Sequence, residues 1–155
     1  MDKTLAAAAL LGATILGSPA LAATVRDCDG NTESAFNIIE PWEASARTFY
    51  QGRVRVASLD TGGEPACCSA HLLVIFYAND DPESFVCRLV SARGATGFAA
   101  IDFKSLKSSY DPSRGLLLTF GYLVFPEGEV GTSATRGVAR VRVNVAGGAV
   151  AVEER

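Results

Sequence analysis

From residue 35 onward, hydrophobic and polar side chains alternate with a period of two, which is typical of β-strands. The clearest stretch covers residues 138–145, where alanine and valine occupy the odd positions and arginine or asparagine follows at most of the even ones. Such a strand turns one face toward an apolar core and the other toward water. The pattern therefore predicts a half-buried strand near the C-terminus.

A hairpin is predicted to follow this strand. Gly147 and Gly148 tolerate the positive φ angles that a two-residue type I′ turn requires. With that turn, the predicted partners are Val145 with Val150, Val143 with Val152, and Arg142 with Glu153. This register places the valines on one face and an oppositely charged pair on the other, which is a self-consistent arrangement.

Further strands are predicted at residues 48–60, 72–77, 85–90, 98–103 and 116–125. Residues 72–77 are continuously apolar, which indicates a central strand covered on both faces. Gly121 predicts a bulge, and residues 105–110 are assigned to one short helix. Turn-forming residues separate the segments at 61–65, 79–82, 111–113 and 126–128. About seven short strands predict an all-β fold, a small antiparallel β-sandwich or barrel.

The first 22 residues have a different pattern. Lys3 precedes an apolar stretch from Leu5 to Leu16, and Ala20 and Ala22 supply the small residues that a signal peptidase requires. This predicts a cleaved secretory signal over residues 1–22 and a periplasmic or secreted protein with no stable membrane anchor. Residues 23–34 are predicted to be a polar arm, and residues 35–155 a single β domain.

Composition narrows the function classes. The 155 residues are 48% hydrophobic, which is too apolar for a disordered chain. The formal net charge of −3 argues against a nucleic-acid partner bound through its phosphates. One domain is expected at this length.

Four cysteines, Cys28, Cys67, Cys68 and Cys87, are disulfide candidates in an exported protein. A bond between the neighbours Cys67 and Cys68 closes a strained eight-membered ring and is set aside. Two pairings remain open: Cys28–Cys67 with Cys68–Cys87, or Cys28–Cys68 with Cys67–Cys87. Either one ties Cys87 to the adjacent pair.

Motifs for catalysis or metal binding are weak. His71 is the only histidine, so any site that needs two imidazoles is excluded. Together with Cys67, Cys68 and Cys87 it offers the ligand types of a Cys₃His zinc site, but adjacent cysteines chelate one tetrahedral ion poorly. No nucleophile motif accompanies it. We expect His71 to open a buried strand, with no catalytic residue, metal or cofactor.

Two surface features remain as candidates for contacts. Trp42 follows Pro41 outside any predicted strand, and is the best candidate for an exposed aromatic contact with a partner. Arg53 with Arg55 and Arg140 with Arg142 are predicted to project from outer faces, either as a shared cationic patch or as solvated, edge-protecting charges.

Residues 37–43 (NIIEPWE), 59–66 (LDTGGEPA), 71–74 (HLLV) and 109–112 (SYDP) resemble a group of uncharacterised exported proteins of alphaproteobacteria. The resemblance covers residues 37 to about 111 and implies no activity, cofactor or catalytic residue.

The sequence therefore favours a noncatalytic envelope domain, with a binding or structural role toward an unknown envelope protein or ligand. The alternatives are a small periplasmic hydrolase with a loop-built site and a thiol- or metal-binding protein.

Overall fold

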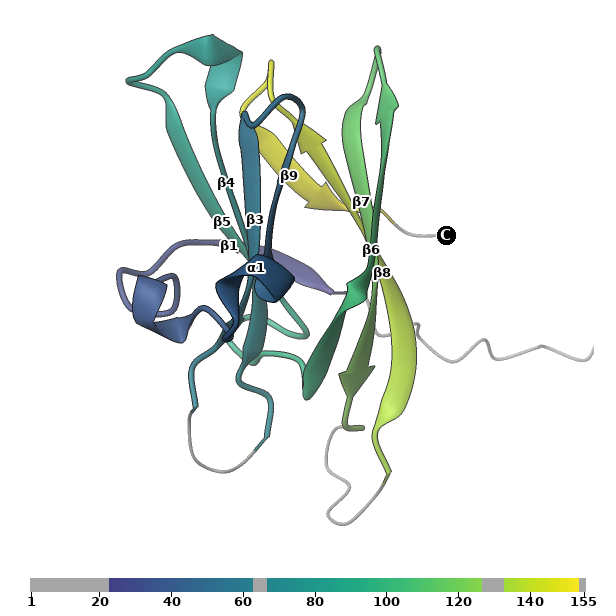
Figure 1. Cartoon of the computed structure of the whole chain (residues 1–155). Coiled ribbons are helices and arrows are strands. Elements are labelled where there is room, and N and C mark those ends of the chain that lie inside the picture. The colour runs from purple at the N-terminus through teal and green to yellow at the C-terminus, as the bar shows by residue number, and fades with distance from the viewer. Residues whose placement is uncertain (1–22, 63–66, 127–132, 154–155) are drawn as a thin grey trace, which may run out of the picture.

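A computed structural model describes residues 23–62, 67–126 and 133–153 (Figure 1). Two antiparallel sheets of five and four strands pack face to face, so the prediction of an all-β sandwich is confirmed. The described residues form nine strands, two more than the sequence pattern indicated. None of the helices in these ranges has the length and apolar character needed to cross a membrane.

The five-stranded sheet has the order β1-β5-β4-β3-β2. Its strands are β1 (Thr24–Asp27), β2 (Ala46–Phe49), β3 (Val54–Asp60), β4 (Ala70–Tyr77) and β5 (Phe85–Ser91). The four-stranded sheet has the order β6-β7-β8-β9, with β6 (Ala100–Asp111), β7 (Gly115–Val124), β8 (Thr135–Asn144) and β9 (Ala149–Val152). Three single-turn helices complete the set: η1 (Ala35–Asn37), α1 (Trp42–Ser45) and η2 (Ala78–Asp80).

The main core lies between the sheets. Leu72, Val74 and Phe76 of β4 are fully buried there, and Phe98 packs edge-on against Phe120 of β7 at 6.1 Å between ring centroids. Burying side chains of this size contributes about 1.5–3 kcal/mol each. Successive side chains of a strand point to opposite faces of its sheet, so every second residue reaches the core between the sheets.

A second, smaller apolar cluster covers the outer face of the five-stranded sheet. Leu59, Leu73 and Leu89 form its centre, and Cys28 and Ile38 from the segment between β1 and β2 pack on them. Strand β4 is therefore buried on both faces, which confirms the central strand predicted at residues 72–77.

Two predicted elements were wrong. The strand expected at 48–60 is a hairpin, because residues 50–53 turn between β2 and β3. The helix expected at 105–110 belongs to β6, because Lys107–Asp111 pair with the first half of β7. The irregularity predicted at Gly121 lies on its partner strand, since the register shifts between Asp102 and Lys107 of β6. The backbone N–H of Gly121 donates to the Ser105 hydroxyl at 2.8 Å within this bulge.

The C-terminal hairpin forms, but its predicted register was wrong by two residues. Val143 pairs with Val150 and Val141 with Val152. The loop is longer because the Val145 carbonyl accepts a hydrogen bond from the Asn79 N–H at 3.1 Å and does not pair with β9. A shift of two keeps the same side chains on the same faces, so the apolar inner face survives.

The cysteine pairing was also predicted wrongly. The disulfides join Cys28 to Cys87 and Cys67 to Cys68. Residues 23–34 were expected to be a polar arm, yet β1 within them pairs with β5 and sets Asp27 opposite Arg88. Continuing that register brings Cys28 beside Cys87, with 5.6 Å between their Cα atoms. The two adjacent cysteines are then left to each other.

Candidate ligand pocket

Four hairpin turns meet at one end of the sandwich, at the top of Figure 1. They join β2 to β3, β4 to β5, β6 to β7, and β8 to β9, so each sheet contributes two. Between them lies a cavity of about 380 Å³, which we call the end pocket. Its lining residues are Tyr50, Arg53, Asn79, Asp80, Tyr110, Pro112, Ser113, Gly115, Leu116, Val143, Asn144, Val145 and Ala146.

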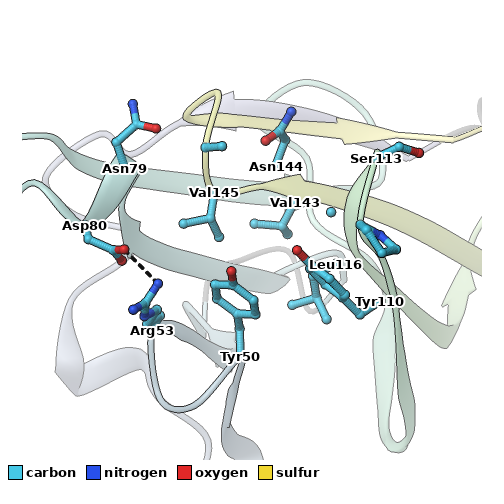
Figure 2. Close-up of a pocket in the computed structure, with 13 residues that line it drawn as sticks. Tyr50, Arg53, Asn79, Asp80, Tyr110, Ser113, Leu116, Val143, Asn144 and Val145 are labelled. Atoms are coloured by element: carbon cyan, nitrogen blue, oxygen red, sulfur yellow. Dashed lines mark hydrogen bonds and ion pairs between the residues drawn. The ribbon is translucent and has the colours of Figure 1, made fainter.

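The floor of the end pocket is apolar and its rim is polar. Leu116 and Val143 are core residues, so the pocket opens directly over the end of the core. In Figure 2 these two and Val145 lie between two rows of polar side chains. One row comprises Asn79, Asn144 and Ser113, and the other Asp80, Arg53, Tyr50 and Tyr110. An apolar base with a few converging polar groups is typical of small-molecule sites.

The second row is a continuous stack. The Tyr50 and Tyr110 rings are stacked with centroids 5.3 Å apart, and the Arg53 guanidinium lies 5.4 Å from the Tyr50 ring centroid. Arg53 Nη1 also donates to Asp80 Oδ2 at 2.7 Å (Figure 2). A hydrogen bond with Tyr50 raises the pKa of the Tyr110 hydroxyl above its usual value, so this phenol is neutral at physiological pH.

Unfavourable backbone conformations gather at the end pocket. Among the described residues, five non-glycine residues have positive φ, and four of them, Tyr50, Gln51, Asn79 and Asp80, belong to two of its turns. Asparagine and aspartate tolerate this conformation, but tyrosine and glutamine do so at a cost of about 1 kcal/mol or more. Conformations of this kind cluster at ligand sites, where they fix side chains in place.

A smaller hollow of about 180 Å³ adjoins the end pocket. It is lined by Arg53, Tyr77, Asp80 and Pro82. Arg53 and Asp80 line both spaces, so their ion pair forms the boundary between them.

His71 lies away from this end, where it opens β4 as expected. It is 3% exposed, and its Nδ1 lies 2.8 Å from the hydroxyl of the fully buried Ser91. Burial lowers the pKa of the imidazole, and the nearby Arg26 charge adds to this. A serine and a histidine at this distance have the composition of a catalytic dyad, but both side chains lie in the interior of the protein.

The described residues contain neither a free cysteine thiol nor a cluster of metal ligands. Cys28, Cys67, Cys68 and Cys87 all belong to disulfides, and a zinc ligand must be a thiolate. Within residues 23–62, 67–126 and 133–153, no three histidine, cysteine or acidic side chains gather as metal ligands.

Of the remaining sequence candidates, Arg53 lies at the end pocket and the others lie elsewhere. Trp42 begins α1 and is 52% exposed, near the exposed Phe36 and Ile39 in the chain but not in the end pocket. Arg53 lies in the β2–β3 turn and binds Asp80, and Arg55 lies in β3. Arg140 and Arg142 lie in β8 of the other sheet and bind Glu153, so the two pairs form no common patch.

Of the residues singled out from the sequence, Arg53 lines the end pocket, whereas Trp42 and the four cysteines do not. Its residues come from four turns that are distant in sequence, and the sequence predicted turns at three of these places: 79–82, 111–113 and 147–148. Tyr50 and Tyr110 gave no signal of their own, because an isolated tyrosine beside a turn is an ordinary surface residue.

Comparisons of the chain with protein-family models, with curated proteins and with solved structures give no match.

Proposed function

We propose that the chain is a noncatalytic binding domain that acts outside the cytoplasm and holds a small ligand in the end pocket. The observation that carries the proposal is the pocket itself: turns from both sheets surround an apolar floor with two polar rows. Loops held at one end of a rigid β-sandwich are a common recognition surface. The cavity volume of about 380 Å³ lies within the range of small-molecule sites.

A periplasmic or extracellular location is part of the proposal. The signal predicted over residues 1–22 lies outside the described residues, so its support comes from the sequence pattern and from the resemblance to exported proteins. Two disulfides add support, because such bonds persist in oxidising compartments.

Binding is favoured over hydrolysis by the charges that line the pocket. Asp80 is the single carboxylate among the described lining residues, and the Arg53 guanidinium holds it at 2.7 Å. Hydrolysis by two carboxyl groups, or by a carboxyl group with an imidazole or a thiol, requires a second side chain of these types beside the first. The described lining includes no histidine, cysteine or second acidic residue.

The test is a thermal-shift assay of residues 23–155 with the low-molecular-mass fraction of an envelope extract and of culture medium. We expect the fraction to raise Tm, as ligand binding to the folded state must. Ala146→Trp fills the pocket from an exposed turn position and should abolish the shift. Ala151→Trp, on the exposed face of β9, is the matched control and should retain it. An equal shift in both variants, or none in the unmodified protein, would overturn the proposal.

A further inference from the structure

The charges around the end pocket cancel. Arg53 and Asp80 are its charged lining residues among those described, and they are bound to each other. A net anion or cation would have to compete with one of these partners, whereas a neutral ligand binds without breaking the pair. Binding of a neutral ligand leaves this 2.7 Å contact intact, whereas the pair offers an ionic ligand no uncompensated charge.

The hydrogen-bonding groups of the two rows are of mixed type. A guanidinium donates only, a carboxylate accepts only, and amide and hydroxyl groups do both. Arg53 and Asp80 lie side by side, and Asn79 is on the neighbouring rim (Figure 2). A pair of adjacent hydroxyl groups, each able to donate and accept, is the complement of an adjacent guanidinium and carboxylate.

The floor of the end pocket offers an apolar surface to a ligand. Leu116, Val143 and Val145 form an apolar strip between the two polar rows. A ligand with C–H groups on its face and hydroxyl groups around its edge matches both features, and this is the composition of a pyranose ring. A flexible polar chain lacks the apolar face, and an aliphatic ligand leaves the rim groups without partners.

The rim is held in place before any ligand arrives. Tyr50 is fixed between Arg53 and Tyr110, and the Asn79 N–H donates to the carbonyl oxygen of Val145 in the β8–β9 turn at 3.1 Å. Such preorganisation reduces the entropy lost when a ligand with many weak polar contacts binds.

We infer that the end pocket binds a neutral saccharide, with one sugar ring over the Leu116–Val143 floor and its hydroxyl groups on the Arg53–Asp80 pair. The inference rests on the proposed binding function and specifies its ligand class. The adjoining hollow, which shares Arg53 and Asp80 and adds Tyr77, receives a second ring. A disaccharide therefore binds more tightly than its monosaccharide.

Isothermal titration calorimetry of residues 23–155 tests this with glucose, N-acetylglucosamine, maltose, cellobiose, lactose and diacetylchitobiose. At least one disaccharide should bind with a dissociation constant below about 1 mM and several-fold more tightly than its monosaccharide. Asp80→Asn, which suits the positive φ of 60°, should weaken binding at least about tenfold. Tyr110→Phe removes one hydroxyl from a ring that is 54% exposed and should weaken it several-fold without affecting folding. Asp102→Asn on the exposed surface of β6 is the control and should bind as the unmodified protein does.

Three results would overturn the inference: no binding across this panel, tighter binding of glucuronate than of glucose, or binding of trialanine in place of the sugars. If the panel fails while the extract fraction still shifts the unmodified protein and not Ala146→Trp, the binding function stands and the saccharide is wrong. If the extract fails as well, both are wrong.

Discussion

Arg142 forms a two-point contact with Glu153: its Nε donates to Oε1 at 2.8 Å and its Nη2 to Oε2 at 3.2 Å. Both side chains are largely buried on the outer face of the four-stranded sheet, and Arg114 and Arg140 also contact the carboxylate. The hydrogen bonds from Arg142 are the main reason that the pKa of Glu153 is lowered. The contact joins β8 to the residue after β9.

We expect Glu153→Gln to lower the free energy of unfolding by about 1 kcal/mol at pH 7, because charge-assisted, two-point contacts are stronger than exposed pairs. The folded-state pKa is depressed, so this stabilisation is present above the unfolded value and is lost as pH falls through the folded one. Urea titrations at pH 7 and pH 3 should show the difference shrinking. Glu43→Gln on exposed α1 is the control, and an equal loss there would contradict the assignment.

His71 should make the free energy of unfolding depend on pH in a range above that of Glu153. Burial lowers its folded pKa, so the unfolded state binds more protons between the folded value and about 6.5. Stability is therefore full above pH 6.5 and falls as the solution is acidified toward the folded pKa. Urea unfolding at pH 7.5 and 5.5 should show this loss in the unmodified protein and a smaller one in His71→Gln. At pH 7.5 that variant should lose about 1 kcal/mol through its contact with Ser91. An identical pH dependence in both proteins would show that His71 is not the titrating group.

The two disulfides should contribute unequally to stability. The Cys28–Cys87 bond closes a loop across 59 residues of sequence separation, for which chain entropy predicts about 4 kcal/mol. The Cys67–Cys68 bond closes almost no chain, so replacing both by serine should cost much less than replacing Cys28 and Cys87 by alanine. Denaturant unfolding measures both changes. Mass mapping of the non-reduced digest should link the peptide of Cys28 to that of Cys87; a link from either to Cys67 or Cys68 would refute this pairing.

The β2–β3 turn offers a stabilising substitution. Gln51 has a φ of 58°, which glycine adopts without the steric cost of a side chain. Gln51→Gly should raise the free energy of unfolding by about 1 kcal/mol, reduced in part by the greater freedom of glycine in the unfolded chain. Gln51→Ala keeps the steric cost and should give no gain. Thermal unfolding of the two variants side by side distinguishes them.

The export proposal predicts a mature N-terminus at Ala23, because Ala20 and Ala22 frame the predicted cleavage site. When the full chain is expressed in a bacterium with a Sec pathway, the exported protein should have the intact mass of residues 23–155 with four oxidised cysteines. A mass that still includes residues 1–22 would contradict cleavage. Ala22→Leu should hinder processing, whereas Ala23→Ser should not.

The sequence pattern predicted the all-β class and most strand positions, but not every strand and not how the turns are built. The local pattern of apolar and polar residues determines which side chains of a strand face the core. The burial of residues 72–77 on both faces and the apolar valine face of the C-terminal hairpin were therefore predicted correctly. The hairpin loop length was not, because it depends on the hydrogen bond between Asn79 in the β4–β5 turn and Val145 in the β8–β9 turn. Strand β1 was missed because four residues next to a polar loop carry little periodicity. The error in the cysteine pairing followed from that omission.

The sequence marked Arg53 and three of the turns around the end pocket, but it could not show that they meet. Tyr50 and Tyr110 are 60 positions apart, and only the packing of the two sheets places their rings 5.3 Å from each other. The positive φ angles at Tyr50 and Gln51 occur in residue types that predict no turn. His71 was assigned correctly to the start of a buried strand, because the continuous apolar run that follows it is enough to predict that strand.

The Cys28–Cys87 bond also determines how the protein responds to a protease. A single cut at any peptide bond between these two cysteines leaves two fragments that remain covalently attached through the sulfur atoms. That interval includes all of the segment that covers the outer face of the five-stranded sheet and the β2–β3 and β4–β5 turns. A nicked molecule therefore keeps its mass on a non-reducing gel and separates into two bands only after a reductant is added. Under the export proposal, this means that one cleavage by an envelope protease in a surface loop of this interval does not release either half.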